Sequence, residues 1–236
     1  MKAVILAAGI GKRLKPLTDT TPKCLIEING RALINYYIEL LNSKGIHEIA
    51  VVIGHLGDSI KQGIKTRPKD ITFIYNPDYT LGNVTSLYAA REFMQGECLL
   101  MDADVYFEPD VLGRLINSQQ KNCFLLDAAV QPTGEEMMLG AVKKRAIAIS
   151  RNPQGKFDLT GEGVGFVRLG AASAKNLISL AKEFIDSGKT NSEYEECLQE
   201  LIKKDYFGYE VITGLKWTEI DFPEDIKKAQ RLFKED

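Results

Sequence analysis

The chain alternates between short apolar runs and longer stretches in which apolar residues recur every three or four positions. The first run, 3–8, is apolar throughout and ends at Gly9, which is typical of a parallel strand buried on both faces. Three further strands are predicted from similar runs, at 47–53, 71–75 and 98–101. Helical spacing predicts the helices between and after them, at 32–43, 58–64, 85–94 and 109–116. This order favours a parallel sheet covered by helices on both faces.

After residue 121 the pattern becomes mixed. Apolar runs predict strands at 123–130, 139–142, 146–150 and 164–169, a late strand pair within 209–220, and helices at 171–186, 192–203 and 223–233. The sequence shows no internal repeat and no linker rich in Pro, Gly or Ser. We therefore expect a single α/β domain over 1–236. Its first half, 1–120, is of the nucleotide-binding type, and its second half, 121–236, shares the same sheet.

Composition narrows the class of protein. Apolar residues make up 44% of the chain and charged residues 26%, as in ordinary globular proteins. Thirty Lys and Arg against 32 Asp and Glu leave a formal net charge of −2, which gives no attraction to nucleic acid or to an anionic membrane. The apolar run at 3–8 is too short for a signal peptide and is followed by Arg13 and Lys15 rather than a cleavage site. The four cysteines are widely spaced, with no C-x-x-C pair. We expect a cytoplasmic protein with no nucleic-acid or membrane partner, and nothing in the sequence indicates its oligomeric state.

The first strand runs into a loop that contains Gly9 and Gly11. Glycines at this point allow a sharp turn and expose backbone N–H groups to an anion, and Arg13 and Lys23 add positive charge for a polyphosphate. The loop is not a dinucleotide fingerprint, because Leu14 stands where the third glycine is needed, and it does not fit a P-loop. A tight turn with solvated basic residues is the alternative interpretation.

Two acidic motifs suggest a metal site. Asp102 and Asp104 follow the strand at 98–101, at the edge where open α/β sheets bind ligands, and carboxylates there attract Mg²⁺. Because they are two residues apart on an extended chain, they point to opposite faces unless the loop turns. Glu219 and Asp221 lie near the C-terminus, where alternation places them on one face of a strand. The alternative for each pair is a structural role in a turn or helix cap.

The stretches 7–18 and 21–23, with the sequences AAGIGKRLKPLT and TPK, resemble the motif of the nucleotidyltransferases that make nucleoside-diphosphate sugars and alcohols. The resemblance covers most of the chain and is sharpest in 3–23, 76–104 and 217–225. It is closest to the small cytidylyltransferases that act on phosphocholine, inositol 1-phosphate or phosphonates. It implies a Rossmann-like, three-layer α/β/α fold with a mixed, mainly parallel sheet, and a Mg²⁺-dependent reaction. A nucleoside triphosphate, expected to be CTP, and a small phosphorylated acceptor are the implied partners.

The resemblance also implies roles for single residues. Arg13 and Lys23 are the expected catalytic contacts to the phosphates, and Asp104 and Asp221 are the expected metal ligands. The expected nucleotide-binding residues are Ala7, Ala8, Gly9, Gly11, Asn83 and Asp102. The expected acceptor-binding residues are Ser86 in the first half and Glu162, Gly165 and Glu219 in the second half. For Asn83 and Ser86, an equal alternative is that they only begin a helix.

The implied chemistry is attack by an acceptor phosphate on the α-phosphorus of the nucleoside triphosphate, with release of pyrophosphate. An aromatic cage for choline is not visible, since the single tryptophan, Trp217, belongs to the motif at 217–225. Phosphocholine is therefore disfavoured, and a polyol or sugar phosphate remains open. Two alternatives stand beside this hypothesis. One is a sugar-1-phosphate enzyme that uses UTP, dTTP or GTP, and the other is a non-catalytic domain that binds nucleotide for regulation.

Overall fold

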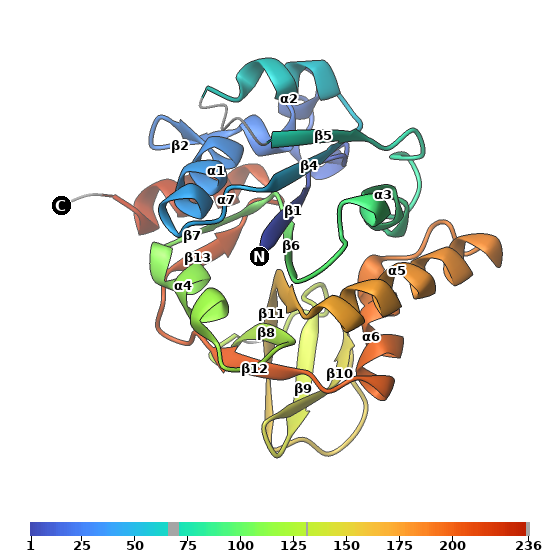
Figure 1. The fold of residues 1–236 in the computed structure, drawn as a ribbon. Coiled ribbons are helices and arrows are strands. Elements are labelled where there is room, and N and C mark those ends of the chain that lie inside the picture. Colours follow the sequence, from blue (N-terminus) through green and yellow to red (C-terminus); the bar gives the residue numbers. More distant parts are fainter. Residues whose placement is uncertain (66–70, 131, 235–236) are drawn as a thin grey trace.

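A sheet between two layers of helices forms the centre of the molecule (Figure 1), in a computed structural model that describes residues 1–65, 71–130 and 132–234. The main sheet contains β1 (Lys2–Leu6), β4 (Ile49–Ile53), β5 (Ile71–Tyr75), β6 (Cys98–Asp102), β8 (Cys123–Asp127), β9 (Met138–Val142), β10 (Arg145–Ser150), β11 (Leu159–Leu169) and β12 (Gly208–Val211). The α-helices are α1 (Leu33–Ser43), α2 (Gly57–Gly63), α3 (Val84–Ala89), α4 (Pro109–Asn117), α5 (Ala171–Asp186), α6 (Tyr194–Lys204) and α7 (Pro223–Leu232). Short 3₁₀ turns cover Lys12–Leu14, Leu17–Asp19, Lys23–Leu25 and Ala90–Glu92.

The main sheet is mixed and its first half is parallel. Its path runs β10-β9-β11-β6-β1-β4-β5, and β6, β1, β4 and β5 pair in parallel. Strand β11 joins the two halves, because it pairs antiparallel with β6 and also with β8 and β9. Strand β12 then pairs in parallel with β8. The expected three-layer fold with a mixed, mainly parallel sheet is confirmed.

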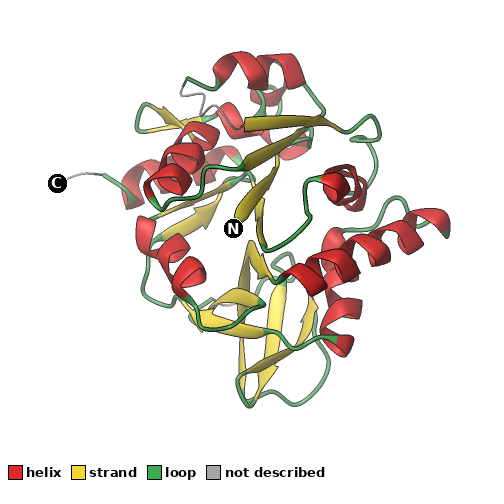
Figure 2. Ribbon diagram, in the orientation of Figure 1, coloured by secondary structure: helices red, strands yellow, loops and turns green. Residues whose placement is uncertain are grey.

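The apolar residues of the parallel strands serve two separate cores. Along β1, Ala3 and Ile5 face the core beneath α1, α4 and α7, whereas Val4 and Leu6 face the core beneath α3, α5 and α6. Figure 2 shows these helices on both sides of the strands. A strand buried on both faces needs apolar residues at every position, which explains the continuous run at 3–8.

Most predicted elements are present, with shifted ends. The strand at 71–75 and the helix at 171–186 have the predicted bounds, whereas the strand predicted at 164–169 begins earlier, at Leu159. The two late strands do not pair with each other: β12 joins the main sheet, and β13 (Trp217–Glu219) pairs antiparallel with β7 (Val105–Phe107) in a small separate sheet. This sheet and the hairpin of β2 (Glu27–Ile28) and β3 (Arg31–Ala32) were not predicted, because strands of two or three residues carry no periodic pattern.

Cys24, Cys98, Cys123 and Cys197 are buried free thiols. Among the described residues, no helix has the length and apolar character needed to cross a membrane.

Gly165 marks the place where β11 changes partners. The register of β11 against β8 shifts between Gly163 and Val167, and Gly165 has a φ of +56°. A Cβ atom built at Gly165 would lie 2.8 Å from Oδ2 of Asp102, at the end of β6. The left-handed backbone and the close approach both require glycine here.

We predict that Gly165→Ala lowers the free energy of unfolding by about 1–2 kcal/mol, because an L side chain is disfavoured in this conformation. The matched control is Gly113→Ala in α4, where an added Cβ meets no described atom within 4 Å. That substitution is expected to stabilise the protein by about 0.5–1 kcal/mol. Urea unfolding of both variants measures the difference, and a loss of equal size in the two would contradict the prediction.

Candidate active site

The loop after β1 forms a small cavity lined by glycine backbone and basic side chains. Gly11 has a φ of +65°, and the hydroxyl of Thr18 donates a 2.8 Å hydrogen bond to its carbonyl, which holds the turn closed. Gly9, Gly11, Lys12, Arg13 and Lys23 line this cavity of about 280 Å³, together with Ile10, Tyr79, Thr80, Leu81 and Asp221. Ala7 and Ala8 are buried just before it, at the end of β1. We refer to this space as the glycine-loop cavity.

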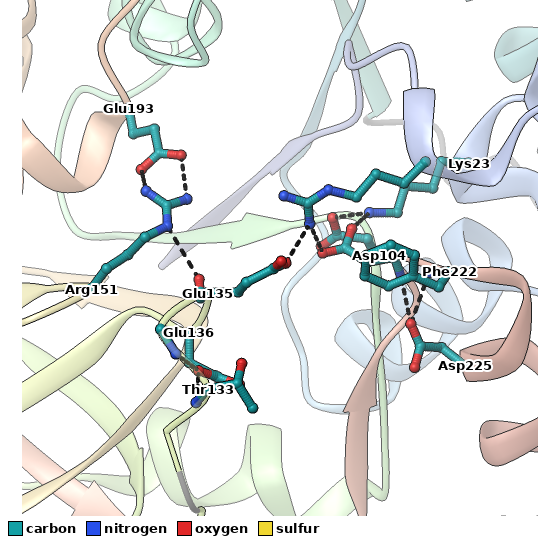
Figure 3. A network of polar contacts seen from close by, with 12 residues as sticks. Lys23, Asp104, Thr133, Glu135, Glu136, Arg151, Glu193, Phe222 and Asp225 are labelled. Atoms are coloured by element: carbon teal, nitrogen blue, oxygen red, sulfur yellow. Dashed lines mark hydrogen bonds and ion pairs between the residues drawn. The ribbon is translucent and has the colours of Figure 1, made fainter.

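Lys23 connects the two carboxylates that the sequence assigned to a metal. Its ammonium lies 2.6 Å from Oδ2 of Asp104 and 2.6 Å from Oδ1 of Asp221 (Figure 3). Arg13 donates a 3.0 Å hydrogen bond to the other oxygen of Asp221. Burial opposes the charge on Lys23, but the two carboxylates outweigh it and raise the pKa of Lys23. Burial likewise disfavours the charge on Asp221, but Lys23 and Arg13 lower its pKa.

The small sheet of β7 and β13 explains why these two carboxylates meet. Asp104 occupies the turn between β6 and β7, and Glu219 pairs with Val105 across the small sheet. The N–H of Ile220 donates a 2.9 Å hydrogen bond to the carbonyl of Asp104. The buried hydroxyl of Tyr37 bonds both the N–H and the carbonyl of Val105, which fixes the turn from the side of α1.

Asp221 does not cap α7. Asp225 takes that role, because its Oδ2 accepts hydrogen bonds from the N–H groups of Asp221 and Phe222 at 3.0 and 2.8 Å. The carboxylate of Asp221 is therefore available to Lys23 and Arg13. The alternative of a purely structural cap at this residue is wrong.

Because the chain turns after β6, Asp102 and Asp104 do not alternate along one strand, and both line the same cavity with different polar partners. The hydroxyl of Tyr194 donates a 2.8 Å hydrogen bond to Oδ2 of Asp102. Burial, with the nearby carboxyl groups of Glu195 and Asp104, holds the pKa of Asp102 well above its usual range. The surroundings of Asp102 therefore disfavour its ionised form.

A larger cavity of about 720 Å³ opens on the other side of Arg13 and Asp221. Asp102 and Asp104 line this cavity. Three other predicted site residues also line it: Asn83, just before α3, and Glu162 and Glu219 of the second half. Burial and the proximity of Asp104 and Glu162 raise the pKa of Glu219 to about 8. We refer to this space as the acidic cavity.

Three predicted site residues have surroundings or hydrogen bonds that the sequence did not indicate. Asn83 lines the acidic cavity, but its Oδ1 accepts a 2.6 Å hydrogen bond from the N–H of Tyr194 and makes no cap bond to α3. Ser86 is buried and bonds the side chain of Asn76 at 2.9 Å, so the structure does not bring it to either cavity. Gly165 lines a small apolar pocket behind Asp102 rather than the acidic cavity.

The residues could hold a divalent cation only after a rearrangement. Among the described residues, no group of three or more metal-ligating side chains is preformed. The two carboxylates on Lys23 nevertheless surround a positive charge with oxygen atoms, and Mg²⁺ is commonly bound by one or two carboxylates together with water and substrate phosphates. Asp104 and Asp221 thus fit such an ion, provided that the ammonium of Lys23 moves away.

Several residues of the acidic cavity were not predicted. Arg151 makes a two-fold ion pair with Glu193 at 2.7 and 2.6 Å and donates to the carbonyl of Glu135, whose carboxylate lies 3.4 Å from Arg13 (Figure 3). Asp127 ends β8 in the structure but lies inside the strand predicted at 123–130, so its position gave no signal. Arg151 follows β10 and Glu193 precedes α6, and only tertiary structure brings them to the site.

Comparison with known proteins agrees with this geometry. The chain is 28% identical over 249 residues to the CTP:phosphoglutamine cytidylyltransferase of Campylobacter jejuni, covering 96% of this chain and 98% of that protein. It is 40% identical over 110 residues to the choline-phosphate cytidylyltransferase of Streptococcus pneumoniae, covering 45% of each. The solved structure of the CTP:phosphocholine cytidylyltransferase from Streptococcus pneumoniae superposes with a TM-score of 0.78 at 26% identity and covers 99% of both chains.

A further solved structure, the inositol-1-phosphate CTP transferase from T. maritima, has the same fold, with a TM-score of 0.79 at 20% identity and coverage of 98% of this chain and 94% of that one. The family described as the MobA-like NTP transferase domain matches residues 3–158, which include the glycine loop, Lys23 and Asp104. The chain therefore belongs to the MobA-like NTP transferase family and is a nucleotidyltransferase.

Proposed function

We propose that the protein transfers a cytidylyl group from CTP to a small phosphorylated acceptor and releases pyrophosphate, with Mg²⁺ as cofactor. One observation carries the proposal: the glycine-loop cavity and the acidic cavity share Arg13 and Asp221 at their boundary. A nucleotide on one side and an acceptor on the other would meet at these residues. The relatives named as cytidylyltransferases favour CTP over the other nucleotides.

The glycine-loop cavity suits the triphosphate. Its lining carries Lys12, Arg13 and Lys23 against the single carboxylate of Asp221 among the described residues, and the glycines allow close approach of the backbone. In the reaction an acceptor phosphate oxygen forms a bond to the α-phosphorus, and the bond to the bridging oxygen breaks. Pyrophosphate leaves with the electron pair, and no proton transfer is needed because the attacking phosphate is already ionised.

The protein's own contribution is to position the two substrates and to balance charge. Arg13 and Lys23 lie where they can neutralise the charge that builds up on the leaving pyrophosphate. Asp104 and Asp221 would hold Mg²⁺ once Lys23 turns toward the phosphates. The ion supplies further positive charge to the phosphoryl oxygens.

The assay is pyrophosphate release with Mg²⁺, each of CTP, UTP, dTTP, GTP and ATP, and a panel of phosphorylated acceptors. We expect acceptor-dependent release with CTP, and we expect Asp104→Asn and Asp221→Asn each to lower kcat on the order of 100-fold or more. The control is Glu92→Gln, which removes an exposed carboxylate far from the cavities and is expected to leave kcat unchanged.

Preference for UTP, dTTP or GTP with a sugar 1-phosphate would replace this proposal with that of a sugar nucleotidyltransferase. Nucleotide binding without turnover of any acceptor would indicate a regulatory domain. Full activity of either aspartate variant would contradict the assignment of the metal ligands.

A second prediction concerns the competition between Lys23 and the metal. Because the ammonium occupies the space between Asp104 and Asp221, Lys23→Met is expected to raise the affinity of the nucleotide-free protein for Mn²⁺ by about tenfold, or about 1.4 kcal/mol. The same variant is expected to lose turnover. Lys12→Met is the matched control, since Lys12 lines the glycine-loop cavity and its substitution leaves both carboxylates paired with Lys23.

Paramagnetic resonance of free Mn²⁺ at pH 7.5 measures the affinity directly. An unchanged or weaker affinity in Lys23→Met would show that the two carboxylates do not form the ion site.

A further inference from the structure

The acidic cavity carries far more negative than positive charge. Its described lining contains eleven carboxyl groups and three cationic side chains, those of Arg13, Arg151 and Lys228. Two of these cations are already committed, Arg13 to Asp221 and Glu135, and Arg151 to Glu193. A ligand that entered with negative charge only would find little compensation here beyond the shared boundary with the glycine loop.

Glu162 is a mostly buried carboxyl group of this lining to which the described residues donate no hydrogen bond. It lies on β11 opposite Asp127 of β8, it is only 8% exposed, and it lines the cavity. Within the part of the chain that the structure describes, its carboxylate has no hydrogen-bond or ion-pair partner. A buried carboxylate without a partner is costly, so its presence beside a cavity indicates a ligand that supplies the missing donor.

The acidic neighbours of Glu162 are held by other donors. Asp127 accepts hydrogen bonds from the indole N–H of Trp217 at 2.9 Å and from the N–H of Ala129 at 3.0 Å. Glu136 accepts from the N–H and hydroxyl of Thr133, and these bonds, with one from the N–H of Gly134, outweigh its slight burial and lower its pKa to about 2. Glu162 therefore faces fixed negative charge.

This charge has a measurable consequence for Glu162. Burial, then the carboxylates of Glu136 and Asp127, raise its pKa to about 7, against a smaller opposing effect of Lys228. A cation placed beside Glu162 would relieve this repulsion and favour the ionised carboxylate, whereas a hydroxyl group would not.

A second orphaned carboxyl oxygen lies in the same lining. Oε2 of Glu195, in the first turn of α6, is buried and has no hydrogen-bond partner among the described residues. The need for donors is therefore not confined to one side chain. It is a property of the cavity.

We propose that the acceptor carries a primary ammonium group in addition to its phosphate or phosphonate, and that Glu162 accepts a hydrogen bond from that ammonium. This inference rests on the proposed function and specifies its acceptor. A protonated amine supplies both the positive charge and the N–H donors that this lining lacks. A polyol phosphate supplies donors without charge.

The aromatic lining argues against a quaternary ammonium. Such a group has no N–H and is recognised by the faces of several aromatic rings. The aromatic side chains in the described lining are Trp217 and Phe222. The guanidinium of Arg13 already lies 5.4 Å from the centre of the Phe222 ring. That leaves the ring of Trp217 in the described lining, and one ring does not form a cage for a trimethylammonium.

The test compares acceptors that differ only in the group remote from the phosphate. Pyrophosphate release is measured with CTP and 2-aminoethyl phosphate, 2-hydroxyethyl phosphate, 3-aminopropyl phosphate, 3-hydroxypropyl phosphate or phosphocholine. We expect each amine to exceed its hydroxyl partner in kcat/KM by about tenfold or more, and both amines to exceed phosphocholine. Glu162→Gln is expected to remove this preference through KM of the amine, while KM of CTP stays unchanged.

Glu162→Asp keeps the charge and is expected to retain a preference for the amine, and thermal unfolding of each variant identifies one that does not fold. Hydroxyl acceptors or phosphocholine that equal the amines, or a preference that survives in folded Glu162→Gln, would overturn the inference and leave the proposed function intact. Calorimetric titration of 2-aminoethyl phosphate into the protein with a non-hydrolysable CTP analogue tests the ammonium site separately from the reaction. Binding in this titration that requires Glu162, together with no pyrophosphate release from CTP in the assay, would support the ammonium site and contradict the proposed reaction.

Discussion

The contact of one ammonium with two carboxylates determines how the active site is built. Lys23 follows the glycine loop, Asp104 follows the fourth strand of the parallel half, and Asp221 precedes the last helix, yet Nζ of Lys23 lies 2.6 Å from an oxygen of each aspartate. Two carboxylates this close repel each other unless a cation lies between them. The site therefore requires a positive charge at this point, whether from Lys23 or from a metal ion that replaces it.

The small sheet of β7 and β13 holds this arrangement in place. Its pairing brings the turn that bears Asp104 beside the segment that bears Asp221, and the bond from Ile220 to the Asp104 carbonyl closes the join. Asp225 caps α7 in place of Asp221, and so leaves the latter carboxylate for Lys23 and Arg13. Asp225 and the backbone of Ile220 thus make the structural hydrogen bonds. The carboxylates of Asp104 and Asp221 are left for Lys23, Arg13 or a ligand.

Elements whose pattern is local could be predicted from the sequence, and contacts between distant elements could not. Continuous apolar runs identified β1 and β4 because both faces of these parallel strands are buried, and the glycines at 9 and 11 indicated the sharp turn after β1. A late strand near β13 was predicted, and the resemblance paired Asp221 with Asp104, but the three-residue strand β7 has no detectable period. The pairing of β7 with β13 that brings Asp221 to the site was therefore not visible. The ion pair of Arg151 with Glu193 depends on packing within the second half, and the bond of Tyr194 to Asp102 depends on packing between the two halves. Ser86 shows the opposite case, since a residue in a suggestive loop turns its side chain to Asn76.

The two cavities differ in charge, and in the proposed reaction they would bind different substrates. Basic side chains gather on the glycine-loop side, where a triphosphate brings the largest negative charge, and carboxylates gather on the other side. Arg13, from the first half, stands at the boundary and contacts two carboxylates of the second half, Asp221 and Glu135. A phosphate group bound near this boundary can share the positive charge of Arg13, whereas around Glu162 the described lining offers Lys228 against several carboxyl groups. Under the proposal made above, a substrate that spans this gradient is negative at one end and positive at the other. That constraint comes from the summed charge of the lining, and no single motif along the chain displays it.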